Sequence, residues 1–62
     1  MALPLSEREK EIVAKIVEGK SRFKIADELF ISDETVKKHT GNIYRKLGIK
    51  SKVELIRLVV AA

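Results

Sequence analysis

The sequence predicts an all-α fold, a four-helix, bundle-like module that contains a helix-turn-helix. Four serines stand where helices begin, and apolar residues follow each of them at helical spacing. No segment alternates between apolar and polar residues as a half-buried strand does, and no hairpin-type turn is present. Because 62 residues suffice for only one small domain, we place a single domain at 1–62, with helices at about 7–18, 22–29, 33–47 and 52–61.

The first helix is marked at both ends. Ser6 and Glu9 have the spacing of a capping box, in which each side chain accepts a hydrogen bond from the other residue's backbone N–H. Gly19 suits the left-handed residue that closes a helix. Between them lies an apolar stripe at helical spacing, made of Ile12, Val13, Ile16 and Val17.

The second and third helices are close together in the sequence. Ser21 can cap the helix at 22–29, whose apolar residues are Ile25, Ala26 and Leu29. Phe30 and Ile31 follow without a polar break, so we expect both to fill the turn. Ser32 can then cap the helix at 33–47, whose first turn carries Asp33 and Glu34, where negative charge complements the helix dipole. This spacing is that of a helix-turn-helix.

The helix at 33–47 has two different faces. Its apolar stripe consists of Val36, Thr40, Ile43 and Leu47, with Tyr44 at the edge, and Gly48 closes the helix. The opposite face carries polar or small residues, namely Glu34, Lys38, Gly41, Asn42 and Arg45, with Lys37 beside them. Such a helix can bury one side and present hydrogen-bond donors on the other.

The last helix, at 52–61, is predicted by a second capping box, Ser51-x-x-Glu54. It is apolar on two sides, which is more than a small core needs. One side holds Leu55, Leu58, Val59 and Ala62, and the other holds Val53, Ile56 and Val60. We expect the second strip to be exposed, and an exposed apolar strip usually indicates a partner.

Charge and composition restrict the function. Residues 1–34 carry 6 basic and 8 acidic side chains, whereas residues 35–62 carry 7 basic side chains and one acidic one. The basic half suggests a polyanion as partner. With no Cys and one His, we expect no metal site, no cofactor and no catalytic residues, so we predict that the chain is not an enzyme. No apolar run is long enough for a membrane span and no leader is visible, so we expect a cytoplasmic protein.

The chain resembles the LuxR/NarL/FixJ-type DNA-binding domain of bacterial transcription regulators over about residues 5–60. The match is carried by Leu5-Ser6-x-Arg8-Glu9, Glu18-Gly19, Ile25-Ala26, Leu29, Ile31-Ser32-x-x-Thr35-Val36-Lys37-x-His39, Asn42-Ile43-x-x-Lys46-Leu47-Gly48 and Ser51-x-x-Glu54. This resemblance implies a tetrahelical, LuxR-type fold. Where the family commonly has Ser-Asn-Lys-Glu-Ile-Ala, this chain has Ser21-Arg22-Phe23-Lys24-Ile25-Ala26, so Lys24 or Arg22 could add a phosphate contact.

The resemblance also implies roles for individual residues. Lys37, Lys38 and Gly41 are similar to positions that face base edges. Asn42 could bond an adenine edge or a phosphate, or could simply be exposed or bonded to its own helix. The resemblance implies phosphate contacts at Thr35, Lys46, Lys50 and Ser51 and at the start of the second helix, where Ser21 lies. Lys24, Ser32 and Arg45 are further candidates for phosphate contacts. Lys52 suits the same role, whereas Arg45 could instead pair with an acid of the first helix, and His39 is expected to be packed.

We therefore expect sequence-specific binding of double-stranded DNA, with 33–47 in the major groove. The resemblance implies a homodimer through Val53, Ile56 and Val60, an N-terminal receiver or ligand-sensing domain as in response regulators of two-component systems, and possible contact with RNA polymerase. Such a regulator would be located on the bacterial nucleoid. Two other hypotheses remain open, a sigma-factor-like promoter-binding region and a helical protein-interaction module.

Overall fold

The computed structural model describes residues 4–61 and confirms the all-α fold. Its helices are α1 (Glu7–Val17), α2 (Arg22–Leu29), α3 (Asp33–Leu47) and α4 (Lys52–Ala61), and no strand occurs within the described part of the chain. Helix α1 ends one residue before the predicted position. Residues 1–3 and Ala62, which the predicted domain included, lie outside the described residues. The place of Ala62 on an apolar side of the last helix is therefore not described.

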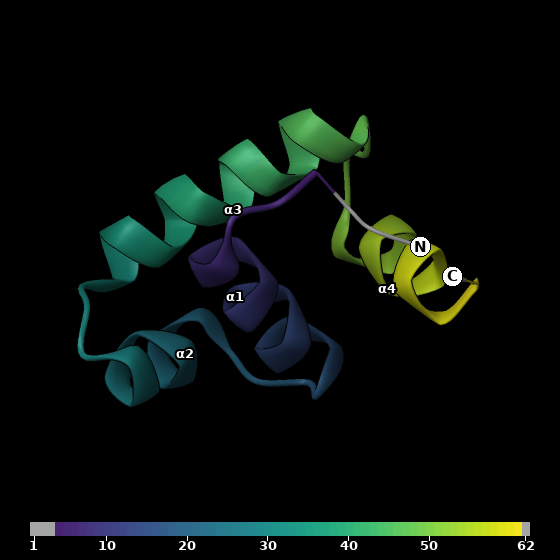
Figure 1. Cartoon of the computed structure of the whole chain (residues 1–62). Coiled ribbons are helices and arrows are strands. Elements are labelled where there is room, and N and C mark those ends of the chain that lie inside the picture. The colour runs from purple at the N-terminus through teal and green to yellow at the C-terminus, as the bar shows by residue number, and fades with distance from the viewer. Residues whose placement is uncertain (1–3, 62) are drawn as a thin grey trace.

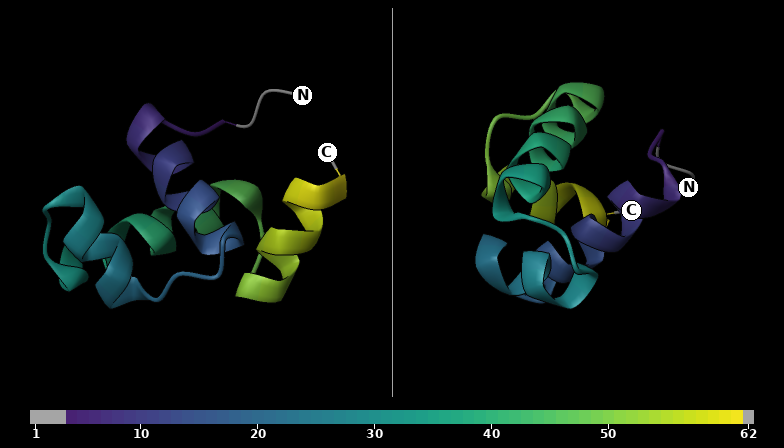
Figure 2. Two further views of the ribbon diagram at one scale, coloured as in Figure 1. Left: turned by 90° about the horizontal axis from the view of Figure 1, so that it is seen from below. Right: turned by 90° about the vertical axis from the view of Figure 1, so that its left-hand side faces the viewer.

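Helix α1 is the centre of the arrangement, because it contacts each of the other three helices. Figure 1 shows α3 crossing above α1, with α2 and α4 on opposite sides of it. The view from below in Figure 2 shows the same separation of α2 and α4. Helix α2 packs against α3 as well as α1, so the helix-turn-helix is held on a single supporting helix.

Each helix contributes at least one fully buried aliphatic side chain to one core. The largest of these side chains are Ile12, Ile25, Val36, Ile43 and Leu55, all at most 2% exposed. The core is completed by Leu5, Val13, Ile16 and Ala26. Burial of each large aliphatic side chain stabilises the fold by about 1.5–3 kcal/mol, and this core fixes which side of α3 faces inward.

The N-terminal caps follow the sequence signals in all but one detail. The Ser6 hydroxyl accepts a hydrogen bond from Glu9 N–H, and the Glu9 carboxylate accepts one from Ser6 N–H at 2.9 Å. At the start of α4, Glu54 N–H donates to the Ser51 hydroxyl at 3.3 Å. The Glu54 carboxylate, however, accepts from Lys50 N–H rather than from Ser51 N–H, so the predicted reciprocal box is shifted by one residue.

Helices α1, α2 and α3 end in the same motif, in which a left-handed residue turns the chain. Gly19 (φ 88°) closes α1 and Gly48 (φ 67°) closes α3, as the sequence predicts. Phe30 (φ 58°) has this role in α2, and the next residue, Ile31, donates its N–H to the Ala26 carbonyl at 3.0 Å. Phenylalanine thus occupies a conformation that costs residues with a Cβ about 1–2 kcal/mol.

The prediction that Phe30 fills the turn was wrong. Its side chain is 94% exposed, whereas Ile31 is half-buried and packs against the core. The left-handed backbone at Phe30 directs the ring away from the protein, and Ile31 supplies the apolar contact that usually follows this motif. Sequence alone indicates an apolar turn but not which of the two residues faces inward.

Glu28 joins the end of α1 to α2. Its carboxylate accepts hydrogen bonds from Lys15 Nζ at 2.6 Å and from Lys20 Nζ at 2.8 Å. These two ammonium groups, Lys15 foremost, lower the pKa of Glu28 from 4.5 to about 2. The charged form is therefore favoured by folding, and the pair of lysines stabilises the contact between α1 and α2.

Phe30→Gly is expected to stabilise the protein, because glycine adopts the left-handed conformation freely and the exposed ring contributes no burial. The expected gain is about 0.5–1 kcal/mol after the entropic cost of glycine is subtracted. Urea unfolding followed by circular dichroism measures it. Gly48→Ala is the reciprocal control and should lower stability by a similar amount. An unfolding midpoint for Phe30→Gly at or below that of the parent would contradict this account.

Glu28→Gln is expected to flatten the acid dependence of stability. Since the pKa of Glu28 is lower in the folded state, its contribution is present above about pH 4.5 and is lost as the pH falls towards about 2. Unfolding midpoints measured across this range should fall less steeply in Glu28→Gln than in the parent. Glu11→Gln, at an exposed position of α1, is the control and should follow the parent. Equal slopes for Glu28→Gln and the parent would refute the contribution.

Candidate nucleic-acid interface

Helix α3 has one face that no other part of the described chain covers. Val36 and Ile43 are 1% and 0% exposed and hold the helix against the core. The side chains on the opposite face are exposed, namely Glu34, Lys37, Lys38 and Arg45, together with the bare backbone at Gly41. A Cβ at Gly41 would meet no atom within 4 Å. Three of the four residues predicted to face bases, Lys37, Lys38 and Gly41, therefore lie on this open face.

Asn42, the fourth residue predicted to face bases, lies differently. It is half-buried and stands about 40° around the helix from Lys38, where the open face meets the flank of α3. His39 is half-buried on the same flank, in keeping with the expected packing role. A side chain at this flank suits a contact with the backbone beside the major groove better than a contact with a base edge.

The start of α3 brings two predicted phosphate ligands together. The Ser32 hydroxyl accepts a hydrogen bond from Thr35 N–H at 3.1 Å, and the two hydroxyl oxygens are 2.8 Å apart. One hydroxyl proton bridges this pair, so the other proton is available to an outside acceptor. The free N–H groups and positive dipole end of the helix add to the attraction for an anion at this position.

The start of α2 combines a cap with exposed cations. The Ser21 hydroxyl accepts from Lys24 N–H at 3.2 Å, and Lys24 itself is exposed. Arg22 lies 3.6 Å from the Asp33 carboxylate and 5.0 Å from the centroid of the Phe23 ring. Arg22 is thus held in place by the first turn of α3 and by an aromatic ring, and its guanidinium remains near the interface.

Lys46 is not a free cation. Its Nζ lies 2.7 Å from the carboxylate of Glu9, which is only 4% exposed. The hydrogen bond from Lys46, followed by the one from Ser6, lowers the pKa of Glu9, so that this buried carboxylate is charged. The sequence allowed Arg45 to pair with an acid of α1, but Lys46 makes that pair, and Arg45 is exposed. Lys46 joins the end of α3 to the start of α1.

The connection between α3 and α4 carries the last two predicted phosphate ligands. Lys50 and Ser51 are both exposed. Lys50 N–H and the Ser51 hydroxyl make the hydrogen bonds of the α4 cap. The Lys50 ammonium has no ion-pair partner among residues 4–61. Lys50 is therefore available to an external anion.

The apolar strip predicted on α4 is open to solvent at two of its three positions. Val53 is 58% exposed, Val60 is 75% exposed, and Ile56 is half-buried. On the other side of α4, Leu55 is fully buried and Val59 packs against the core. The helix therefore uses one apolar side for the core, and on the strip Val53, Ile56 and Val60 the two outer residues, Val53 and Val60, remain exposed.

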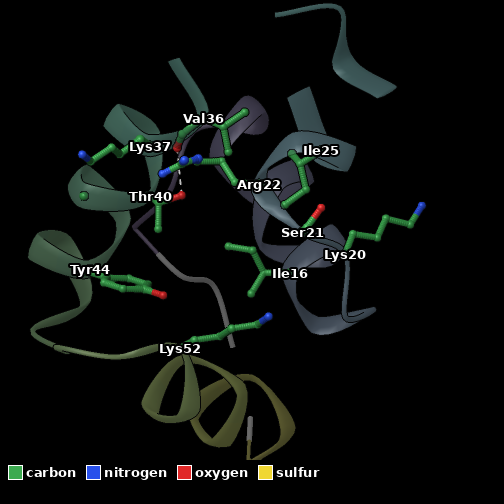
Figure 3. Close-up of a pocket in the computed structure, with 11 residues that line it drawn as sticks. Ile16, Lys20, Ser21, Arg22, Ile25, Val36, Lys37, Thr40, Tyr44 and Lys52 are labelled. Atoms are coloured by element: carbon green, nitrogen blue, oxygen red, sulfur yellow. Dashed lines mark hydrogen bonds between the residues drawn. The ribbon is translucent and has the colours of Figure 1, made fainter. Parts of the chain in front are cut away.

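A groove of about 400 Å³ runs beside the open face of α3, between the starts of α2 and α4 (Figure 3). Its apolar lining comes from Ile16, Ile25 and Val36. Its polar lining is Lys20, Ser21, Arg22, Lys37, Thr40, Gly41, Tyr44 and Lys52. Thr40 is already engaged, because its hydroxyl donates to the Val36 carbonyl at 2.8 Å. The groove thus adjoins the face that carries Lys37 and Gly41.

Sequence reasoning did not anticipate this groove or the place of Tyr44 in it. The groove is formed by residues from all four helices, so no local pattern marks it. The only signals in the sequence are the positions of Tyr44, at the edge of the apolar stripe of α3, and of Lys52, at the start of α4. The burial of Glu9 was not predicted either. The capping box placed Glu9 at the start of α1, but it did not indicate the ion pair with Lys46.

Neither a cluster of metal-binding side chains nor a membrane-spanning helix occurs within residues 4–61. No group of three or more His, Cys, Asp or Glu side chains within residues 4–61 could hold a metal ion. No helix in the described part of the chain is long and apolar enough to cross a membrane.

Comparison with known proteins places these features in a family. The pattern described as "Bacterial regulatory proteins, luxR family" matches residues 3–59. The spore germination protein GerE of Bacillus subtilis is 43% identical to this chain, over 87% of the chain and 78% of GerE. The Fimbriae Z protein of Escherichia coli is 52% identical, over 84% of this chain but 25% of its own length. The oxygen regulatory protein NreC of Staphylococcus aureus is 48% identical, over 84% of this chain and 24% of its own length. The chain thus spans most of GerE and about a quarter of the other two.

Proposed function

Since the chain belongs to the luxR family of bacterial regulatory proteins and is a DNA-binding domain of that family, we propose that α3 enters the major groove. In this proposal Lys37 and Lys38 donate to base edges, and the bare backbone at Gly41 allows close approach to the DNA. Lysine can donate to guanine O6 and N7, and a good base contact discriminates by about 1–3 kcal/mol. Binding is then sequence-specific for double-stranded DNA.

The observation that carries this proposal is the division of α3 into two faces. The core covers Val36 and Ile43, so Lys37 and Lys38 are directed away from the protein. No other described element lies over them, and the positive side chains are not neutralised by ion pairs among residues 4–61. A helix held in this way can lie in a groove of DNA while the rest of the domain stays outside it.

Phosphate contacts on both flanks of α3 would fix the position of the domain on the duplex. We propose that these contacts come from the hydroxyls and helix ends Ser21, Ser32, Thr35 and Ser51, and from the cations Lys24, Arg45, Lys46 and Lys50. Asn42 is reassigned from base edge to backbone because it lies half-buried on the flank. Lys46 should contribute least, since Glu9 already neutralises it at 2.7 Å.

The strip Val53, Ile56 and Val60 supports a homodimer through α4. Two copies joined by such a strip would present two α3 helices to the same duplex, so that adjacent half-sites are bound together. The exposure of Val53 and Val60 is what favours an interface here, because burial of these apolar side chains is favourable and the domain itself does not bury them.

The proposal extends to the regulator as a whole. The part that aligns with this chain is about a quarter of the Fimbriae Z protein and of NreC. We therefore propose that this module belongs to a longer regulator, in which a receiver or ligand-sensing domain controls it, as in two-component systems. Contact with RNA polymerase and location on the bacterial nucleoid belong to the same proposal. The family match over residues 3–59 disfavours the sigma-factor-like alternative, and the family is one of regulators rather than enzymes.

Selection from a randomised duplex pool is expected to enrich one motif with two related half-sites. Lys37→Ala/Lys38→Ala should then bind the selected duplex at least about tenfold more weakly than the parent, because two base-facing donors are lost. Fluorescence anisotropy at one salt concentration measures both affinities.

The matched control is Arg8→Ala/Lys10→Ala, which removes the same charge from the exposed surface of α1. It should retain most of the affinity. If Lys37→Ala/Lys38→Ala bound the selected duplex as tightly as this control, α3 would not be the recognition helix.

Ile56→Glu is expected to prevent pairing of two copies while leaving the monomer folded, because Ile56 lies in the strip and outside the fully buried core. Sedimentation velocity, with and without the selected two-half-site duplex, measures the pairing. Ala61→Glu introduces the same charge on another side of α4 and serves as the control. Dimers of Ile56→Glu equal in strength to those of Ala61→Glu would rule out this interface.

A further inference from the structure

We propose that Glu34 is a specificity-determining residue of α3, and that its carboxylate accepts a hydrogen bond from the N4 amino group of a cytosine in the major groove. This inference rests on the proposed function. It adds one acceptor to a face of α3 whose other charged side chains are cations. It also predicts one position of the DNA site, a cytosine close to the bases that Lys37 and Lys38 contact.

Glu34 lies in the first turn of α3, on its open face. Its side chain is exposed, as are those of Lys37 and Lys38. At about 100° per residue, Gly41 stands about 20° from Glu34 around the helix axis. Lys38 and Lys37 stand about 40° and about 60° from it. In a helix-turn-helix, the N-terminal residues of the recognition helix contact base edges. DNA that approaches Lys37 and the bare backbone at Gly41 therefore also meets Glu34.

The carboxylate of Glu34 is not engaged within the described part of the chain. Lys37 and Lys38 follow it at spacings at which opposite charges often pair on a helix. No ion pair joins Glu34 to either lysine or to any other described residue, and no side-chain hydrogen bond reaches it. Asp33, the other acid of this turn, differs, because it lies 3.6 Å from Arg22. Glu34 is therefore open to an external donor.

A free carboxylate on a surface that faces DNA is selective, because most groups that DNA presents repel it. Phosphates are negative, and guanine presents only the acceptors O6 and N7 in the major groove. Adenine presents a donor beside the acceptor N7, and thymine presents an acceptor and a methyl group. Only cytosine presents a donor without an acceptor on the same base edge. Glu34 can therefore favour cytosine and disfavour the other three bases at one position.

The alternative is that Glu34 serves only the dipole of α3, which negative charge in the first turn complements. A carboxylate with that role alone repels every phosphate in the same way, so it weakens binding to all sequences equally. A contact with cytosine instead affects one base pair. The two roles therefore differ in how binding depends on the DNA sequence.

The spacing along α3 indicates where the cytosine should lie. Glu34 precedes Lys37 and Lys38 by about 4.5 Å and about 6 Å along the helix axis. Successive base pairs of DNA are about 3.4 Å apart. Because lysine suits guanine, a cytosine is expected within about two base pairs of the guanine that these lysines select.

Selection from a randomised duplex pool, carried out with the parent, Glu34→Ala and Glu34→Gln, tests the inference. The parent should enrich a cytosine in each half-site, and thymine in its place should weaken binding about tenfold by fluorescence anisotropy. In Glu34→Ala the same replacement should change the affinity by less than about twofold, because the discriminating contact is lost. Glu34→Gln should favour adenine there, since a carboxamide matches adenine N6 and N7. Circular dichroism verifies that both variants are folded.

The matched control is Glu11→Ala, which removes an exposed carboxylate from α1 and should keep the cytosine preference of the parent. If the parent enriches a motif and Glu34→Ala depends on the cytosine as strongly as Glu11→Ala, the inference is overturned and the proposed function stands. If Glu34→Ala binds every duplex more tightly by one factor, its carboxylate only repels phosphates, and the inference is equally overturned. If the parent enriches no motif, sequence-specific binding itself fails, and the inference fails with it.

Discussion

The burial of one side of α3 against α1 and α2 is the constraint on which the rest of this structure depends. Val36 and Ile43, two helical turns apart, are 1% and 0% exposed, and they meet a core formed from all four helices. Once these two side chains are inside, the geometry of the helix places Lys37, Lys38 and Gly41 outside. The exposed face of α3 is thus a consequence of how the core is packed.

Ion pairs join the helices, and one of them, Lys46–Glu9, links the basic half of the chain to the acidic half. The acidic N-terminal half supplies Glu9 and Glu28, which pair with Lys46 of α3 and with the two lysines near the end of α1. These contacts join α2 and α3 to α1 and engage the carboxylates of Glu9 and Glu28 within the domain. Partly buried pairs of this kind are screened less by salt than the exposed lysines, so the fold should be less sensitive to salt than binding.

Much of the fold could be predicted because its signals are local. The serine caps, the closing Gly19 and Gly48, and the two-faced character of α3 are each determined within a few residues. Phe30 was predicted wrongly because the direction of a side chain after a helix depends on one backbone angle, which no residue pattern specifies for an aromatic. Phenylalanine closes α2 in the left-handed conformation that glycine adopts at the ends of α1 and α3.

The interface was less predictable than the fold, for a physical reason. Lys37 and Lys38 could be placed from the period of one helix, whereas the partner of Lys46 and the half-burial of Asn42 depend on how α3 sits against α1. The groove depends on all four helices at once, and it gives Tyr44 and Lys52 a position that their neighbours in the sequence do not indicate.

The central claim is that DNA lies against the outer face of α3, and titration of the ¹⁵N-labelled chain with duplex DNA by NMR tests it most directly. The account predicts that backbone amide shifts concentrate at Lys37, Lys38 and Gly41 and at the starts of α2 and α4. The amides on the exposed face of α1, such as those of Lys10 and Ala14, should stay unchanged. Shifts concentrated on α1, or around Phe30 with none on α3, would contradict the claim.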